Sequence, residues 1–470
     1  MTDTVFFRPD GGWVGDVIPF QRDGVFHLWY LFDDREVPKT GMPWHLVTTT
    51  DFVHFEDRGL AVPSGGPDAE DFNVYTGSVV IDDDGVAHLF STAQNPTRRG
   101  ADGRPLQLVA HAVSTTGLEG WIKHPELTVG APEGYETGDW RDPFVFRDGD
   151  RWRMLVAARH SDGPERRRGT IAQLTSTDLD SWIPVEPFWD PRRYIAHECP
   201  DVFRWGEWWY LVYSEFSDAF CTRYRIARSL DGPWLAPDDD TVDARPFYAA
   251  KTVERDGRRF FVGWIATREG HADDGAWQWA GTMSTLEATQ RADGTLAFHL
   301  PDEFLGSFTV PVASGVPVPA HLDGTDRFVQ SIGDLDLPDT CLLTAEFDIA
   351  DGTEEVGILL RATADGEEAG AIRLEPRRNR VVFDRWPRTC TGDEQWQISG
   401  DVPFVLERPC PLPAGRHRVE VVVSGDILVA VVDRRVALST RLYRRAGERV
   451  GVFVNGGAAD LVSLEIRTRP

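Results

Sequence analysis

The chain has 470 residues, 41% of them hydrophobic, and 17 tryptophans, which indicates a folded protein of more than one domain and excludes a disordered chain. Its 75 acidic residues outnumber its 49 basic ones, so the formal net charge is −26. Such a charge repels nucleic acid and anionic membrane surfaces, and we expect neither as a partner.

Five segments before the proline-rich middle of the chain repeat one pattern, a turn signal followed by a strand of alternating aromatic or apolar residues. The segments are 23–30, 84–90, 148–155, 206–213 and 256–264. A repeat of roughly 50–65 residues with four strands is typical of a propeller blade. The sequence therefore predicts an all-β fold that begins with a five-bladed β-propeller.

The pattern changes after a proline-rich stretch at 307–324. Short apolar strands, separated by turn signals, follow at 342–349, 356–361, 370–374, 381–384, 418–423, 427–432 and 461–466. Such strands predict a β-sandwich, with a role in support or in carbohydrate binding. We therefore expect a catalytic propeller of residues 1–305, a linker of residues 306–324 and a C-terminal sandwich of residues 325–470.

The amino terminus lacks the segments of a secretory signal, and nowhere do about 18 apolar residues run together. The cysteines lack metal-ligand spacing and are odd in number. They are Cys199, Cys221, Cys341, Cys390 and Cys410. These features predict a reduced, cytoplasmic protein without a metal site.

Three carboxylates, Asp16, Asp142 and Glu198, occupy the same place in three of the repeats, six to eight positions before the hairpin turn. The strand before that turn is the innermost strand of a blade, so the three groups would converge on one central pocket. Chance is the alternative, because acidic residues are abundant, and Asp142 before a proline could simply form a turn with an ion pair. Asp16 and Glu198 lie in apolar stretches, where a carboxylate needs either a hydrogen-bond or ionic partner or a role in the function of the protein.

Carboxylates that converge in this way suit glycosyl transfer to water. The transition state resembles an oxocarbenium ion, which needs a carboxylate on one face and a proton donor on the other. The separation of the two groups, which the sequence does not reveal, decides between retention and inversion.

The chain resembles the family 32 glycoside hydrolases, the β-fructofuranosidases that include invertases, inulinases and levanases. Residues 140–143 are similar to the family's Arg-Asp-Pro motif, and residues 198–201 match its Glu-Cys-Pro-Asp motif. Weaker similarities lie at 44–55, 75–80 and 247–250. The resemblance implies that Glu198 is the general acid and base, and that Asp142 contacts sugar hydroxyls and stabilises the transition state.

The first motif departs from the family's Trp-Met-Asn-Asp-Pro-Asn-Gly, since the chain reads Trp-Val-Gly-Asp-Val at 13–17. Asp16 keeps its spacing to the hairpin and is assigned the role of nucleophile by resemblance. The asparagine amides are absent, which leaves the precise sugar open. The predicted substrate contacts are Trp13, Trp44, Thr76, Ser78, Arg141, Tyr248 and Trp264.

The resemblance implies a retaining hydrolase of β-fructofuranosides, acting on sucrose, fructo-oligosaccharides, levan or inulin without a cofactor. The alternatives are a fructosyltransferase, an inverting five-bladed arabinofuranosidase or xylosidase, and a sugar-binding propeller without activity. We expect a small-molecule or oligosaccharide substrate as partner, and a homo-oligomer is possible.

Overall fold

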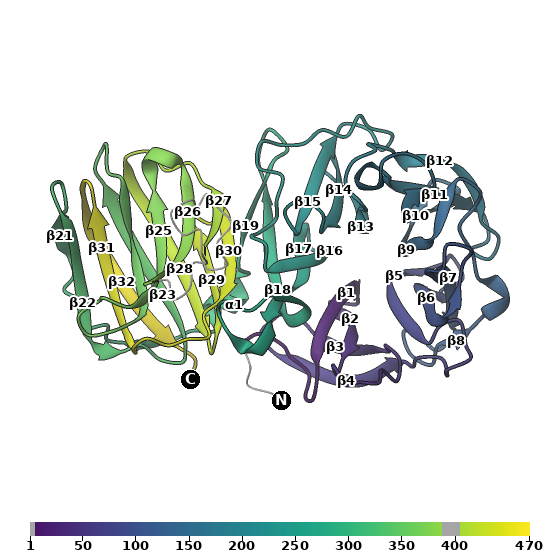
Figure 1. Cartoon of the computed structure of the whole chain (residues 1–470), viewed down its shortest axis with the longest axis horizontal. Coiled ribbons are helices and arrows are strands. Elements are labelled where there is room, and N and C mark those ends of the chain that lie inside the picture. The colour runs from purple at the N-terminus through teal and green to yellow at the C-terminus, as the bar shows by residue number, and fades with distance from the viewer. Residues whose placement is uncertain (1–4, 388–404) are drawn as a thin grey trace.

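The computed structural model describes residues 5–387 and 405–470. The amino-terminal part of the chain forms a ring of sheets, and the carboxy-terminal part forms a two-sheet sandwich beside it (Figure 1). Within the described ranges the one α-helix is the short α1 (Asp302–Gly306), between the two parts. The predicted all-β class, a five-bladed propeller followed by a sandwich, is confirmed.

Each blade is an antiparallel meander whose strands follow one another along the chain. The strands of the first three blades are β1 (Trp13–Arg22), β2 (Val25–Asp33), β3 (Trp44–Thr49) and β4 (Phe55–Val62); β5 (Asn73–Ile81), β6 (Ala87–Arg99), β7 (Pro105–Ser114) and β8 (Ile122–Lys123); and β9 (Tyr135–Asp148), β10 (Arg151–His160), β11 (Gly169–Ser176) and β12 (Ile183–Trp189). Those of the last two are β13 (Glu198–Trp205), β14 (Trp208–Glu215) and β15 (Cys221–Ala227); and β16 (Phe247–Arg255), β17 (Arg258–Arg268), β18 (Trp277–Gln290) and β19 (Leu296–His299).

The turn signals act as the sequence predicts. In the hairpins at Asp23-Gly24 and Asp256-Gly257, both turn residues have positive φ, which is the conformation of a type I′ turn. Aspartate and glycine tolerate this conformation, and its twist matches that of the flanking strands. The two innermost strands of a blade are thereby joined in a fixed register.

The ring closes between the first and the last blade. Val14 of β1 pairs with Gly281 of β18, so both blades belong to one sheet. The segment before β1 adds to the closure, because the backbone N–H of Met283 donates to the carbonyl of Phe7. The first strand of the chain is thus held by the last blade.

The sandwich packs two sheets around an apolar core that includes Phe347, Ile358 and Val452. One sheet has the order β20 (Val310–Val312), β32 (Ala458–Thr468), β23 (Thr340–Ile349), β28 (Gly415–Ser424), β29 (Ile427–Val432) and β30 (Val436–Arg441), with β21 (Ala320–Asp323) also on β32. The other has the order β22 (Phe328–Asp336), β31 (Arg449–Asn455), β24 (Glu355–Ala362), β25 (Ala369–Glu375), β26 (Arg380–Trp386) and β27 (Leu406–Pro409). Strands β20 and β21 lie within the segment predicted as a linker, whose boundaries stay a prediction.

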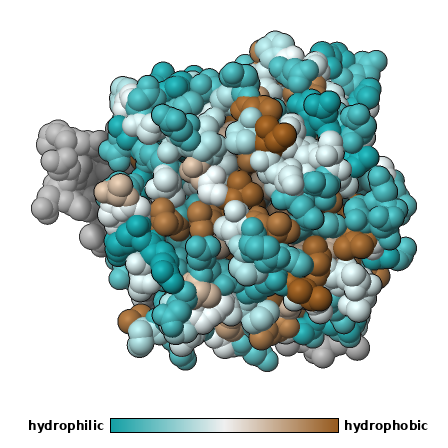
Figure 2. Space-filling model, turned by 90° about the vertical axis from the view of Figure 1, so that its right-hand side faces the viewer, coloured by the Kyte–Doolittle hydropathy of each residue, from teal (hydrophilic) through white to brown (hydrophobic). Residues whose placement is uncertain are grey.

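The outer edge of the propeller faces solvent. Figure 2 shows groups of hydrophobic residues interspersed with hydrophilic ones on this side of the molecule. Exposed apolar side chains on the outermost strands include Ile122 of β8 and Ile183 of β12.

No helix in the described part of the chain is long and apolar enough to span a membrane. Of the five cysteines, four are free and buried, and Cys390 lies outside the described residues.

Candidate active site

Every innermost strand of the propeller contains a β-bulge in its pairing with the next strand of the blade. The pairing shifts at residues 14–17 in β1, 75–77 in β5, 141–144 in β9, 198–201 in β13 and 248–251 in β16. A bulge leaves residues without a ladder partner and re-aims their side chains, which is why bulges recur beside active sites. These five strands surround the axis of the ring (Figure 1).

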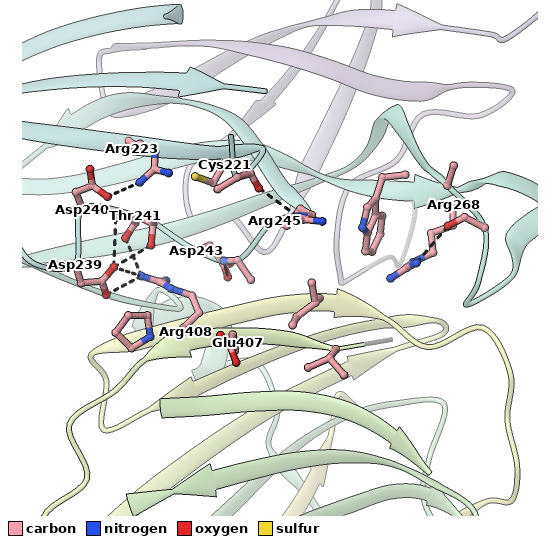
Figure 3. A pocket seen from close by; sticks show the side chains of 18 of the residues that line it. Cys221, Arg223, Asp239, Asp240, Thr241, Asp243, Arg245, Arg268, Glu407 and Arg408 are labelled. Atoms are coloured by element: carbon pink, nitrogen blue, oxygen red, sulfur yellow. Dashed lines mark hydrogen bonds and ion pairs between the residues drawn. The ribbon is translucent and has the colours of Figure 1, made fainter. Parts of the chain in front are cut away.

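The three predicted carboxylates line one cavity of about 440 Å³, together with Thr76 and Arg141. They come from β1, β9 and β13, at the bulges of three different blades. A larger cavity of about 670 Å³ lies between the propeller and the sandwich, where Arg408 bonds to Asp239 (Figure 3), and none of the three carboxylates lines it. We therefore place the candidate site at the centre of the ring.

Asp16 is held through both of its carboxylate oxygens. The hydroxyl of Thr76 donates to Oδ2, and the indole Nε1 of Trp264 donates to Oδ1 at 3.0 Å. Burial raises the pKa of Asp16, and the charge of Glu198 adds to the rise, whereas the bonds from Thr76 and Trp264 oppose it. These two donors therefore orient the carboxylate and favour its ionised form.

Asp142 is buried at the next corner of the cavity. Its backbone is left-handed, with φ of 59°, and its N–H donates to Thr92 Oγ1 at 2.7 Å. The backbone N–H of Cys199 donates to its Oδ2 at 2.9 Å. Burial, with the charges of Glu198 and Asp16, raises the pKa of Asp142 to about 7, against the opposing charge of Arg141. Near neutral pH this group can therefore accept or donate a hydrogen bond.

Glu198 is the carboxylate more open to the cavity, since its side chain is 22% exposed and that of Asp142 is 5% exposed. The hydroxyl of Tyr248 donates to its Oε2 at 2.6 Å, and Nη2 of Arg141 donates to its Oε1 at 3.1 Å. Both partners donate, so the carboxyl is fixed in orientation while its outer face stays accessible. Such a group is suited to exchange a proton with a bound molecule.

A comparison with known families assigns the chain to a family. The family model "Glycosyl hydrolases family 32 N-terminal domain" matches residues 6–297, more than half of the chain. The chain belongs to glycosyl hydrolase family 32. The resemblance stated from the motifs is thereby confirmed, and the protein is a glycosidase.

Named relatives of this family 32 chain cleave sugars. It is 23% identical over 456 residues to a sucrose-6-phosphate hydrolase of Zymomonas mobilis, covering 89% of this chain and 83% of the relative. It is 26% identical over 314 residues to a raffinose invertase of Escherichia coli, covering 61% and 62% of the two chains.

Solved structures share the fold of the family 32 chain. An exo-inulinase of Aspergillus awamori superimposes with a TM-score of 0.78 at 17% identity, over 100% of this chain and 98% of the other. Fructan 1-exohydrolase IIa of Cichorium intybus gives a TM-score of 0.77 at 17% identity, over 99% and 96%. Both similarities extend over the propeller and the sandwich.

Four of the predicted substrate contacts adjoin the carboxylates of the candidate site in this family 32 chain. Thr76 and Arg141 line the cavity. Tyr248 and Trp264 are buried behind it, bonded to Glu198 and Asp16. Their contact with a sugar stays a prediction, whereas their contact with the carboxylates is direct.

Three predicted contacts do not line the cavity of the candidate site in this family 32 chain. Trp44 is buried and donates through Nε1 to the carbonyls of Val74 and Tyr75. The buried hydroxyl of Ser78 donates to the carbonyl of Pro143. The ring of Trp13 is covered by guanidinium groups, with that of Arg8 4.0 Å away. Their contact with a sugar stays a prediction.

Sequence reasoning did not assign several residues that line the cavity. Asp139 accepts bonds from Arg104 in the turn between β6 and β7, from Arg141 on β9 and from Arg159 on β10. Arg104 and Asp139 both line the cavity, as does Trp279. Asp139 has a weak signal, since it precedes the Arg-Asp-Pro motif by two positions and shares a strand face with Arg141. Trp279 has no spacing that separates it from the other tryptophans.

Proposed function

We propose that this protein hydrolyses β-fructofuranosides with retention of configuration. Asp16 attacks the anomeric carbon of the fructosyl unit while Glu198 protonates the oxygen of the leaving group. Glu198 then takes a proton from water, which releases fructose from Asp16. The observation that carries the proposal is that both side chains line one cavity and are each fixed by two donors.

The surroundings of the two carboxylates suit these different roles. The donors to Asp16 favour the ionised form that a nucleophile needs. Glu198 has an exposed face from which a proton can pass to the substrate. Asp142, with a pKa raised to about 7 by burial and neighbouring acids, supplies hydrogen bonds to sugar hydroxyls.

The preferred substrate is proposed from the charged residues that line the cavity. Both arginines among the described residues that line the cavity are paired, Arg104 with Asp139 and Arg141 with Glu198, so neither of the two is free to bind a phosphate. We therefore propose sucrose and short fructo-oligosaccharides as preferred substrates over sucrose 6-phosphate. A cytoplasmic location and a homo-oligomer remain predictions from the sequence.

The test is a set of release assays on the purified protein. Sucrose, sucrose 6-phosphate, raffinose, inulin and levan are compared by the fructose that each releases, and NMR follows the anomer first formed. Hydrolysis with retention, lost in Glu198→Gln, is the expected result. Release of the inverted anomer, or full turnover by Glu198→Gln, would refute the mechanism, and fructosyl transfer at high sucrose would identify a transferase.

A further inference from the structure

Gly15 precedes the proposed nucleophile, Asp16, and the surrounding side chains leave no room for a side chain at this position. It is buried and its φ is not positive, so its backbone suits other residues. A Cβ placed here would lie 2.4 Å from Cη2 of Trp279 and 2.9 Å from Cβ of Leu31. The Cβ of Leu31 is attached to its strand and moves only with the backbone, and the indole of Trp279 would have to rotate away. The indole of Trp279 thus fills the space that a side chain at position 15 would need.

The position of Trp279 is fixed from two directions. Its carbonyl accepts a hydrogen bond from Nη2 of Arg35 at 3.1 Å, and the same guanidinium bonds to the side chain of Gln278 at 3.0 Å. Its ring meets that of Trp264 edge-on, with centroids 6.1 Å apart and an interplanar angle of 67°. Trp264 in turn donates to Asp16. Trp264 therefore lies between the indole of Trp279 and the nucleophile, and it contacts both.

Trp279 nevertheless remains 38% exposed and lines the cavity of the carboxylates. An anchored indole with an open face is a surface on which the apolar face of a sugar can pack. Leu31 also lines the cavity and shares the contact with position 15. The cavity is thus apolar beside Asp16, whereas charged groups surround Glu198.

We propose that Trp279 is a specificity-determining residue that packs against the furanose over Asp16, and that Gly15 is required to admit it. This inference rests on the proposed function. Here the sugar is recognised through its C–H face, by a ring in the place of a polar side chain at position 15. An apolar wall discriminates weakly against a substrate that lacks one hydroxyl, unlike a wall of hydrogen-bonding groups.

The experiment is a double-mutant cycle on the full chain with Gly15→Ala, Trp279→Ala and the double variant. The measurements are kcat and KM for sucrose, and the Kd for fructose by calorimetry, which needs no turnover. Trp279→Ala should raise KM and Kd about tenfold while kcat changes less, and Trp279→Phe should recover most of the loss. Gly15→Ala should be harmful in the parent and should cost clearly less beside Trp279→Ala, because only the contact with Leu31 then remains.

Trp277→Ala is the matched control, since Trp277 lies two positions earlier on β18 and lines the cavity between the domains. It should leave KM and Kd unchanged. An unchanged Kd in Trp279→Ala, or an equal cost of Gly15→Ala in both backgrounds, would overturn the inference. Fructose binding that depends on Trp279 without any hydrolysis would refute the proposed function alone, and no fructose binding by the parent would overturn both.

Discussion

Asp139 offers a direct test of how the site is held together. Its side chain is 8% exposed and accepts bonds from Arg104, Arg141 and Arg159. Two of these partners, Arg141 and Arg159, are themselves 12% and 6% exposed, so solvent screens the interaction little. Neutralising one member of a buried ion pair typically costs roughly 3–5 kcal/mol, because it leaves an uncompensated charge. We expect the substitution Asp139→Asn to destabilise the propeller by this amount.

The same change should act on the chemistry. Arg141 bridges Asp139 and Glu198, so without its anchor it no longer fixes the proposed acid. We expect kcat/KM for sucrose to fall at least about tenfold, which corresponds to about 1.4 kcal/mol. Urea unfolding followed by tryptophan fluorescence measures the stability, and initial rates measure the activity.

The matched control is Asp148→Asn in the same blade. Asp148 pairs with Arg153, and its side chain is 34% exposed, so the loss should be at most about 1 kcal/mol. Burial alone would raise the pKa of Asp139, but Arg141 and Arg104 hold it below its ordinary value. Its stabilisation is therefore present above the unfolded pKa of about 3.9 and is lost as pH falls through the folded value. If Asp139→Asn behaves like the control, or its deficit persists undiminished in acid, the reasoning fails.

Further predictions concern the three carboxylates. Glu198→Gln should lower kcat by about 10²–10⁴-fold, as expected for loss of a general acid, and a rate within threefold of the parent would contradict the assignment. The pKa of Asp142, raised to about 7 by burial, means that its stabilisation is present in acid and is lost as pH rises through 7. The melting temperature should therefore fall between pH 5 and 8 more steeply in the parent than in Asp142→Asn, and parallel curves would refute this. Thr76→Val removes a donor to Asp16, so its pKa should rise further and the acid limb of the kcat/KM profile should move to higher pH, whereas an unmoved limb would show that this bond does not tune the nucleophile.

The fold could be predicted because its signals are local. Aspartate-glycine turns and alternating strands are read within a few residues, and the spacing of Asp16, Asp142 and Glu198 to their turns placed each on an innermost strand. The strands β20 and β21, however, pair with β32 at the far end of the chain. Such pairing between distant segments has no local signal, so the sequence alone does not predict it.

The remaining parts of the site depend on contacts between blades. Asp139 meets Arg104 across 35 residues, and Trp279 meets Gly15 across most of the propeller. Residue type did not separate Trp44, which is packed in the core, from Trp279, which is open to the cavity. The bulges that aim the carboxylates arise from strand pairing, which the order of residues does not reveal.

The pairing of β1 with β18 has a consequence for synthesis of the protein on the ribosome. The indole that holds Asp16 lies 248 positions further along the polypeptide. An emerging chain therefore cannot organise its attacking group until the fifth blade has been translated and has docked. Contacts between such distant segments form late and slowly. A chain truncated before the fifth blade would therefore contain the carboxylates of the site without an assembled active site.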